Sequence, residues 1–394
     1  MFYMKKTNIL EIIGILSLSL ILLSSFAVSS CLPEMLQLFP DRDRASVEFL
    51  ISSPSMSMVV MIALTPILTG FMSERLIVTL GLLLCGVCGI VPFFIHSFSV
   101  ISVSRILMGV GIGLLNAKAV SLIGERFTGT LRLKLQGIRC SMETIGQAVM
   151  FFVVGQLLRF GWNYAFLIYG VAFVILIMYY AFVPAAPKQT ASTDNNKATS
   201  DHTMKISKKD GIIILLNFLL GMILVSSAVL MSLRLTSYVV ESSLGTAVDG
   251  ANIMSLSVFA GFIGGLCFGK LMQTFGHLVL PLSLLFMAGG MTAISLASSL
   301  VLVGVGACVC NFFITIGTSY MFNGLSEHLP VELLNTANSI VLVGCNLGSC
   351  TISFVLQVIG LINPRLSFAY LCYAIGLSIL AVGVFINDWY KKVN

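Results

Sequence analysis

The sequence predicts an all-α membrane protein of twelve transmembrane helices, arranged as two pseudo-symmetric halves of six. Hydrophobic residues make up 57% of the chain and charged residues only 10%. Apolar stretches long enough to cross a bilayer recur along its whole length, and one long polar stretch divides them into two sets. A soluble globular chain has roughly 25% charged residues. The composition therefore excludes a fold with a water-exposed surface.

About 20 consecutive apolar residues cross the hydrocarbon core of a bilayer. The first stretch follows Lys5 and Lys6 but is too long for the apolar core of a secretory signal, so we expect it to be retained. Pro54 and Pro66 are predicted to loosen the second span, because each lacks a backbone donor. We predict spans at roughly 9–31, 46–71, 77–96, 99–123, 136–158 and 162–183, and again at 211–234, 247–271, 278–298, 300–324, 332–358 and 366–388.

The stretch between the sixth and seventh spans has the Pro, Ser, Thr, Asn and Lys mixture of a flexible linker. We therefore predict an N-terminal half over 1–183, a linker over 184–210 and a C-terminal half over 211–394. Most of the 22 Lys and Arg residues lie on the side shared by the linker and both termini. Five are expected on the opposite side: Arg42, Arg44, Arg159, Arg234 and Arg365. Since basic residues are enriched in cytoplasmic loops, both termini are predicted to be cytoplasmic, in a multi-pass protein of the inner (cytoplasmic) membrane.

Short stretches of the two halves are similar. GVGIGLLNA (109–117) in the fourth predicted span is matched by GVGACVCNF (304–312) in the tenth, which places Asn116 opposite Asn311. A glycine-containing stretch also follows the second span at Gly70 and the eighth at Gly269. Two matches at similar offsets, 195 (304 minus 109) and 199 (269 minus 70), predict duplicated halves related as parallel repeats.

Motifs of catalysis and cofactor binding are not found in the sequence. It has no HExxH, GxSxG or GxxxxGK[ST] run, so we predict neither an enzyme nor a nucleotide-driven pump, and we expect no cofactor and no metal. Cys85 and Cys88 form a CxxC without a second pair or a His cluster, which favours packing over a metal site. Because the basic residues are scattered at span ends, nucleic acid is excluded as a partner.

The six-plus-six arrangement, the basic linker and the loop after the second span resemble the major facilitator superfamily. Its loop motif, G-x-x-x-D-R-x-G-R-R/K, is matched in part by GFMSERL, which contains Gly70, Glu74 and Arg75. Its fourth-span motif, an Arg followed by glycines, is matched by RILMGVGIG, which begins at Arg105. The resemblance implies alternating access, a gating latch at Gly70, Glu74 and Arg75, and a role for Arg105 in proton coupling.

The chain is similar to the branch of bacterial facilitators that exports drugs and metabolites. The fifth-span motif of proton-driven exporters keeps its spaced glycines here, at Gly146 and Gly155, but lacks the proline. The resemblance implies an antiporter for efflux of a drug-like or metabolite substrate in exchange for protons, acting as a monomer among membrane lipids. Ion-coupled uptake of a small organic anion is the alternative, because basic residues outnumber acidic ones within the predicted spans.

Ionisable side chains at membrane depth cost at least about 2.5 kcal/mol on insertion scales, which makes each a functional candidate. We count Arg105, Lys118 and Arg139 against Glu143. Arg139 and Glu143 lie four apart on one helix face, so they are predicted to pair and, with Arg105, to couple transport to protons; a structural ion pair is the alternative. Arg105 can otherwise snorkel to the membrane surface, and Lys118 can do the same or meet Glu125. Five amides are predicted to bind substrate, with interhelical hydrogen bonding as the alternative: Asn116, Asn311, Gln147, Asn338 and Asn346.

Overall fold

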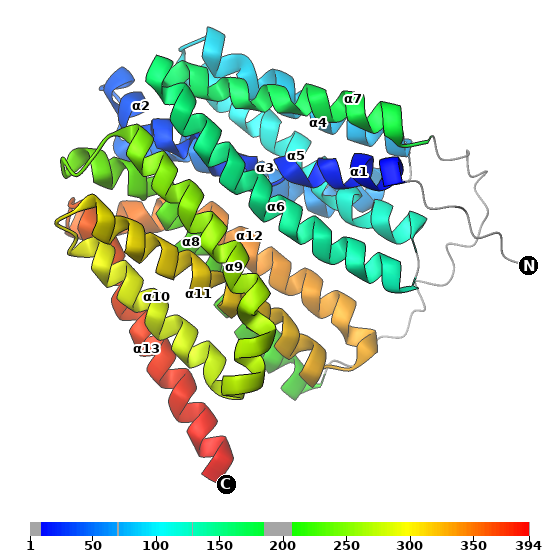
Figure 1. Ribbon diagram of the computed structural model, residues 1–394, viewed down its shortest axis with the longest axis vertical. Helices are drawn as coiled ribbons and strands as arrows, with labels where there is room; N and C mark the ends of the chain where they lie inside the picture. The colour runs from blue at the N-terminus through cyan, green and yellow to red at the C-terminus, as the bar shows by residue number, and fades with distance from the viewer. Residues whose placement is uncertain (1–8, 69–70, 128, 185–206, 394) are drawn as a thin grey trace, which may run out of the picture.

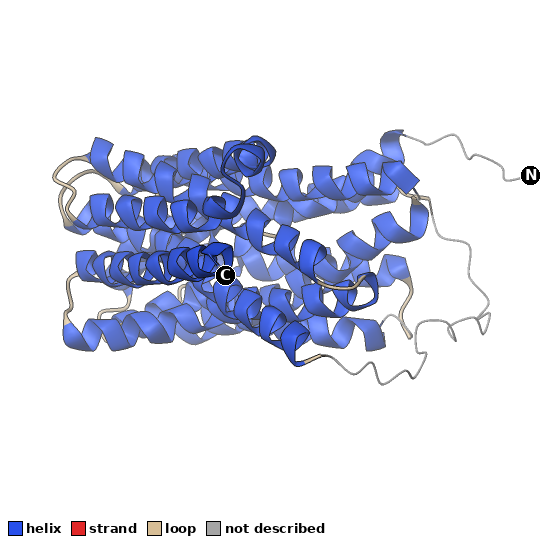
Figure 2. Cartoon of the chain, turned by 90° about the horizontal axis from the view of Figure 1, so that it is seen from below, coloured by secondary structure: helices blue, strands red, loops and turns tan. Residues whose placement is uncertain are grey.

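The computed structural model describes residues 9–68, 71–127, 129–184 and 207–393, and this part of the chain is helical almost throughout (Figures 1 and 2). The helices form two groups, α1–α7 and α8–α13, which occupy the upper and lower parts of Figure 1. We call the end of the bundle where α1 begins and α7 ends the linker end, and the opposite end the distal end. Most of the predicted linker lies outside the described residues.

Each predicted span corresponds to one helix or to one interrupted helix. In the first group these are α1 (Ile9–Ser17), η1 (Leu18–Ile21), η2 (Ser24–Cys31), α2 (Leu32–Leu38), α3 (Arg44–Leu68), α4 (Glu74–Phe94), α5 (Phe98–Arg126), α6 (Gly129–Leu157), η3 (Leu158–Phe160), η4 (Trp162–Gly170) and α7 (Val171–Phe182). In the second they are α8 (Lys208–Glu241), α9 (Ala247–Phe275), η6 (Gly276–Leu278), α10 (Val279–Ser295), α11 (Leu300–His328), α12 (Val331–Ile362) and α13 (Leu366–Val393). The second group therefore starts slightly before the predicted boundary.

The helices account for the twelve expected spans. Among the described residues, nine stretches are long and apolar enough to cross a membrane, or ten if a bent pair in the first span is counted. One of these stretches, Ala247–Ser295, contains both α9 and α10. The 25-residue helix α3 is a further span.

The first span is interrupted rather than continuous. Short 3₁₀ segments, η1 and η2, stand between α1 and α2, and the two parts of the span are bent by 42°. The segment is rich in serine, whose hydroxyl competes for backbone groups; Ser17 Oγ donates to the Gly14 carbonyl at 2.8 Å. The interruption places the Ser24 and Ser25 carbonyls within reach of side chains from other helices.

The two groups repeat each other at an offset of 202 residues. The helix α11 begins 202 residues after α5, and α12 begins 202 residues after α6. The sequence similarity that pairs Asn116 with Asn311 is therefore out of register. Asn116 is the nineteenth residue of α5, whereas Asn311 is the twelfth of α11. Gly269, matched to the loop after α3, lies inside α9.

Two glycine contacts obey the same offset. A Cβ atom on Gly146 of α6 would lie 2.5 Å from the Leu20 carbonyl oxygen, and one on Gly348 of α12 would lie 2.4 Å from the Met222 carbonyl oxygen. Each glycine therefore lets a fifth helix touch the backbone of the first helix in its own half. Small residues allow such close packing in lipid, where helices gain nothing from hydrophobic association.

We predict that Gly146→Ala and Gly348→Ala each destabilise the fold by about 1–3 kcal/mol, because the added methyl group overpacks a backbone contact. Thermal unfolding in detergent measures the effect. Gly289→Ala is the matched control, since no atom lies within 4 Å of its added Cβ. Equal unfolding temperatures for all three variants would contradict the assignment.

Candidate functional site

Arg105 is fully buried in the first helix group, with 0% of its surface exposed. Its Nε donates to the Leu50 carbonyl at 3.1 Å, and its Nη2 donates to the carbonyls of Ser25 at 2.5 Å and Ile51 at 3.3 Å. Its Nη1 donates to the Tyr169 hydroxyl at 2.9 Å. The side chain does not snorkel. It binds backbone carbonyls, the neutral acceptors that were one of the expected partners.

Irregular backbone supplies these acceptors. Pro54 has no N–H, so the Leu50 carbonyl lacks its usual partner four residues on, and Arg105 takes that place. The helix α3 stays helical through Pro54, so the predicted loosening appears as a free carbonyl rather than a break. Gly109 brings α5 close to this turn, because a Cβ there would lie 2.3 Å from the Pro54 oxygen.

Arg139 and Glu143 of α6 form the predicted ion pair, and Arg139 Nε also donates to Gln136 Oε1 at 3.1 Å. Both charged side chains are mostly buried. An ion pair along one helix neutralises both groups, so neither leaves an uncompensated charge in the bilayer.

The direction of this pair follows from the neighbours of α6. Gly146 packs against the first span, and the Ala148 carbonyl accepts from Ser255 of α9 in the second group at 2.7 Å. At 3.6 residues per turn, Gln147 projects between these two contacts and Glu143 lies beside it on the same arc. The exposed Val149 lies on the opposite arc. The polar arc of α6 therefore faces the space between the two groups rather than lipid.

The other predicted amides differ in their contacts. Asn311 Nδ2 donates to Ser257 of α9 at 3.0 Å, which is an interhelical bond, and Asn346 Nδ2 donates to its own helix at Leu342. Within the described part of the chain, Asn116, Gln147 and Asn338 have no side-chain hydrogen bond, and all three are half-buried.

Asn346 and Asn338 lie on the face of α12 that meets the first group. Ser353 of α12 shares a hydrogen bond with Ser52 of α3 at 2.8 Å. Asn346 is two helical turns from Ser353 on the same face, toward the linker end. The structure thus brings amides of α12 and the polar arc of α6 to the boundary between the groups.

A buried ion pair joins the groups near the distal end. Arg234 of α8 donates from Nε and Nη2 to the two Glu48 oxygens of α3, at 2.9 and 3.1 Å. Glu48 is 0% exposed and Arg234 is 5% exposed. Bidentate geometry makes such pairs strong and directional.

This pair corrects the sequence analysis. Arg234, placed on the opposite membrane surface, lies two turns inside α8, because that helix continues to Glu241. Glu48 was absent from the count of embedded charges although it falls inside the predicted span 46–71. An acidic residue within an apolar span is the signal that could have found it.

Further contacts close the same end of the molecule. All lie within ten residues of a distal helix end, or about 15 Å at 1.5 Å per residue. They are Arg44–Glu241, Ser52–Ser353, Ser30–Thr236, Gln156–Asn252 and Ser255–Ala148. The distal end is therefore closed in this conformation.

The predicted gating latch lies at the linker end. Gly70 is outside the described residues. Glu74 accepts from Arg126 at 2.6 Å and from the Tyr179 hydroxyl at 2.8 Å. Arg75 donates to the Val183 carbonyl at 3.0 Å. These contacts hold the linker ends of α4, α5 and α7 together within the first group.

Comparisons with known proteins agree with this architecture. Residues 14–353 match the family model described as Major Facilitator Superfamily. A search of curated proteins finds no match.

Solved structures of similar fold include three transporters. The inward-open xylose transporter XylE from E. coli has a TM-score of 0.73 at 17% identity, covering 95% of this chain and 94% of that one. A D-xylose-proton symporter has 0.78 at 18%, covering 96% and 97%. The nucleoside transporter NupG has 0.77 at 13%, covering 96% and 100%. At these identities the likeness shows the fold alone.

We predict that Glu48→Gln opens the distal end. Removing one partner of a buried pair strands the other charge, at a cost of about 3–5 kcal/mol in the closed form. Cys140, exposed on the polar arc of α6, reports the change, because opening the distal end brings the linker ends together. A polar maleimide should label it more slowly in nanodiscs.

Glu241→Gln is the matched control, because its pair with Arg44 is partly exposed and contributes at most about 1 kcal/mol. The double variant Glu48→Gln with Arg234→Gln should recover part of the labelling rate, since no charge is then stranded. Slowing by Glu241→Gln equal to that by Glu48→Gln would refute the assignment.

We also predict that Arg105→Lys lowers the unfolding temperature markedly. An ammonium group has three donors and cannot reproduce the planar guanidinium fork that reaches two helices and Tyr169 at once. Thermal unfolding measures the loss, and Arg365→Lys, in an exposed loop, is the control. An unchanged Arg105→Lys protein would show that the network contributes little.

Proposed function

Because this chain belongs to the major facilitator superfamily, we propose that it exports a small uncharged or cationic molecule in exchange for protons. The family and the fold make it a multi-pass membrane transporter that works by alternating access, and not an enzyme. The coupling ion, the direction and the substrate class are the proposal. In it, the halves 1–183 and 211–394 rock about the boundary between the helix groups.

Charge balance supports the substrate class. Arg234 is paired with Glu48, Arg139 with Glu143, and Lys118 with Glu125 at 3.2 Å. Arg105 is enclosed by neutral acceptors. None of these cations is free to hold an organic anion. The excess of basic residues that favoured anion uptake is therefore cancelled by partners, and this is the observation on which the proposal rests.

Glu143 is the proposed proton-binding group. It faces the boundary between the groups, and its partner Arg139 stands on the same helix. A cationic substrate and a proton would compete for this carboxylate, and competition for one site is what exchange requires. Arg139 would hold the carboxylate ionised when neither is bound. The role expected for Arg105 becomes a positioning one, because its donors are occupied.

Uncharged amides complete the proposed substrate site. Gln147 lies one turn from Glu143 on α6, while Asn346 and Asn338 approach from α12. Asn116 adds a half-buried amide on α5. Asn311 is bound to Ser257, so we assign it to positioning within the second group.

The closed distal end supports an inward-facing state if the linker end is cytoplasmic, as the distribution of basic residues predicts. The spaced glycines of α6 favour export through the resemblance already noted. Gly155 packs on the second group, since a Cβ there would lie 2.9 Å from Cβ of Ala251. Growth of cells expressing the chain on a panel of toxic organic cations, neutral compounds and organic anions tests the substrate class. Protection only against anions, or increased sensitivity to them, would favour uptake of an anion.

We predict that Glu143→Gln abolishes flux driven by a pH gradient, because the amide cannot exchange a proton. The assay uses proteoliposomes and a compound found in the growth panel, with and without the gradient. Glu125→Gln, a change in a half-exposed carboxylate, is the control. Equal gradient-driven flux in Glu143→Gln and the parent would remove Glu143 from the mechanism.

A further inference from the structure

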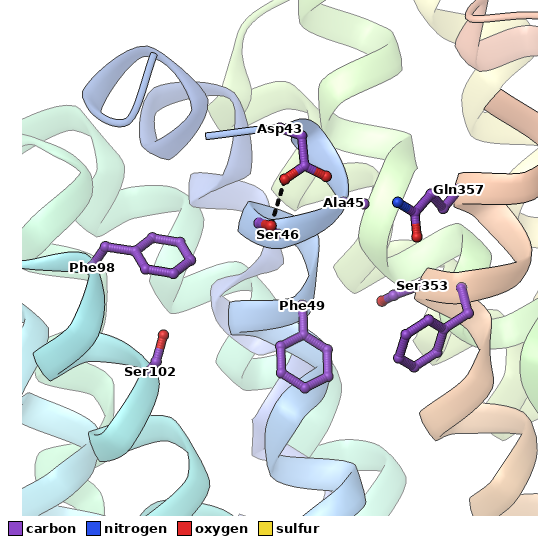
Figure 3. A pocket seen from close by; sticks show the side chains of 9 residues that line it. Asp43, Ala45, Ser46, Phe49, Phe98, Ser102, Ser353 and Gln357 are labelled. Carbon is purple, nitrogen blue, oxygen red and sulfur yellow. Dashed lines mark hydrogen bonds between the residues drawn. The ribbon is translucent and has the colours of Figure 1, made fainter. Parts of the chain in front are cut away.

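A cavity of about 380 Å³ lies near the distal end, between α3 and α5 of the first group and α12 of the second (Figure 3). Its size falls within the range of small-molecule sites, about 300–1,000 Å³. It is separate from the polar arc of α6 and from the amides proposed to bind substrate. The lining consists of Asp43, Ala45, Ser46, Phe49, Phe98, Ser102, Ser353, Phe354 and Gln357.

The walls are aromatic. Phe49 of α3 and Phe354 of α12 face each other across the boundary, with ring centroids 6.3 Å apart. Phe98 of α5 forms the opposite side of the cavity in Figure 3. Aromatic faces bind apolar bodies and also attract cations.

The mouth carries a carboxylate. Asp43 accepts a hydrogen bond from the Ser46 hydroxyl, and within the described residues it has no salt-bridge partner. The neighbouring cations are engaged elsewhere: Arg42 lies over the Phe98 ring at 5.0 Å, and Arg44 pairs with Glu241. Asp43 is therefore a negative group without a partner at the edge of an aromatic cavity.

The cavity depends on the conformation of the transporter. Its floor includes Ser353, which is bonded to Ser52 across the two groups, and its walls come from both groups. Opening the distal end would separate Phe354 from Phe49 and take the site apart. A ligand that binds only one state stabilises that state.

We propose that this cavity binds a small amphipathic amine, with the ammonium on Asp43 and the apolar body between Phe49 and Phe354, and that binding holds the distal end closed. The ligand acts as a conformational effector that approaches from the distal side. The proposal requires neither export nor proton coupling. It predicts that the amine binds and locks the protein whether or not it is transported.

The test uses the full chain in nanodiscs of phosphatidylcholine and phosphatidylglycerol. The probe is 4-phenylbutylamine, and 4-phenylbutanol is its uncharged analogue. We expect the amine to bind at least tenfold more tightly than the alcohol, as measured by equilibrium dialysis. Asp43→Asn should remove this preference, while Asn still caps the start of α3. Asp41→Asn, a change in the same loop outside the cavity, should leave it intact.

A conformational readout tests the second part of the proposal. The amine should restore maleimide labelling of Cys140 in the Glu48→Gln variant toward the parent rate, and that variant should bind the amine more weakly than the parent. Phe354→Ala, a change in a largely exposed side chain, should weaken binding by about tenfold and gives a second test if Asp43→Asn folds poorly.

Several results would overturn the proposal. They are equal affinity for amine and alcohol, equal effects of Asp43→Asn and Asp41→Asn, and binding without any change in Cys140 labelling. Another is an Asp43-dependent labelling change produced by phosphatidylethanolamine in the nanodisc and not by the amine. That result would assign the cavity to a lipid.

Discussion

A positive charge inside a bilayer must be satisfied by the protein itself, and the first half of this chain is built around that constraint. The Arg105 guanidinium has no carboxylate partner. It is held by backbone carbonyls of two other spans and by the Tyr169 hydroxyl. Regular helices offer few such carbonyls, because their acceptors are already bonded. The proline in α3 and the interrupted first span provide them.

This network and the contacts at the linker end hold the first group together. Arg105 joins spans one, two, four and six within the membrane, while Arg126 joins Glu11 and Glu74 at the linker end. The interface between the groups is different in kind. Its buried charge is carried by one pair, Glu48 and Arg234, beside small hydroxyl and amide contacts. A firm body with a separable interface is what rocking motion needs.

Local patterns determined much of what could be predicted. Hydropathy located the helices to within a few residues at most ends, because lipid burial demands about 20 apolar residues wherever a span occurs. The spacing of Arg139 and Glu143 identified their pair for the same reason, since four residues along a helix place two side chains on one face. The glycines after Arg105 also mark a real close approach, between α5 and α3.

The sequence by itself determined the number of spans, the position of the linker and the one ion pair that lies within a single helix. Only the tertiary structure decided the register of the repeat, the break in the first span and the pairing of Glu48 with Arg234. The glycines at 146 and 348 occupy equivalent places because each touches a backbone 126 residues away (146 minus 20, 348 minus 222). Glu48 meets a partner 186 residues away. Such contacts depend on how helices are placed beside one another, which no periodicity within a single span encodes.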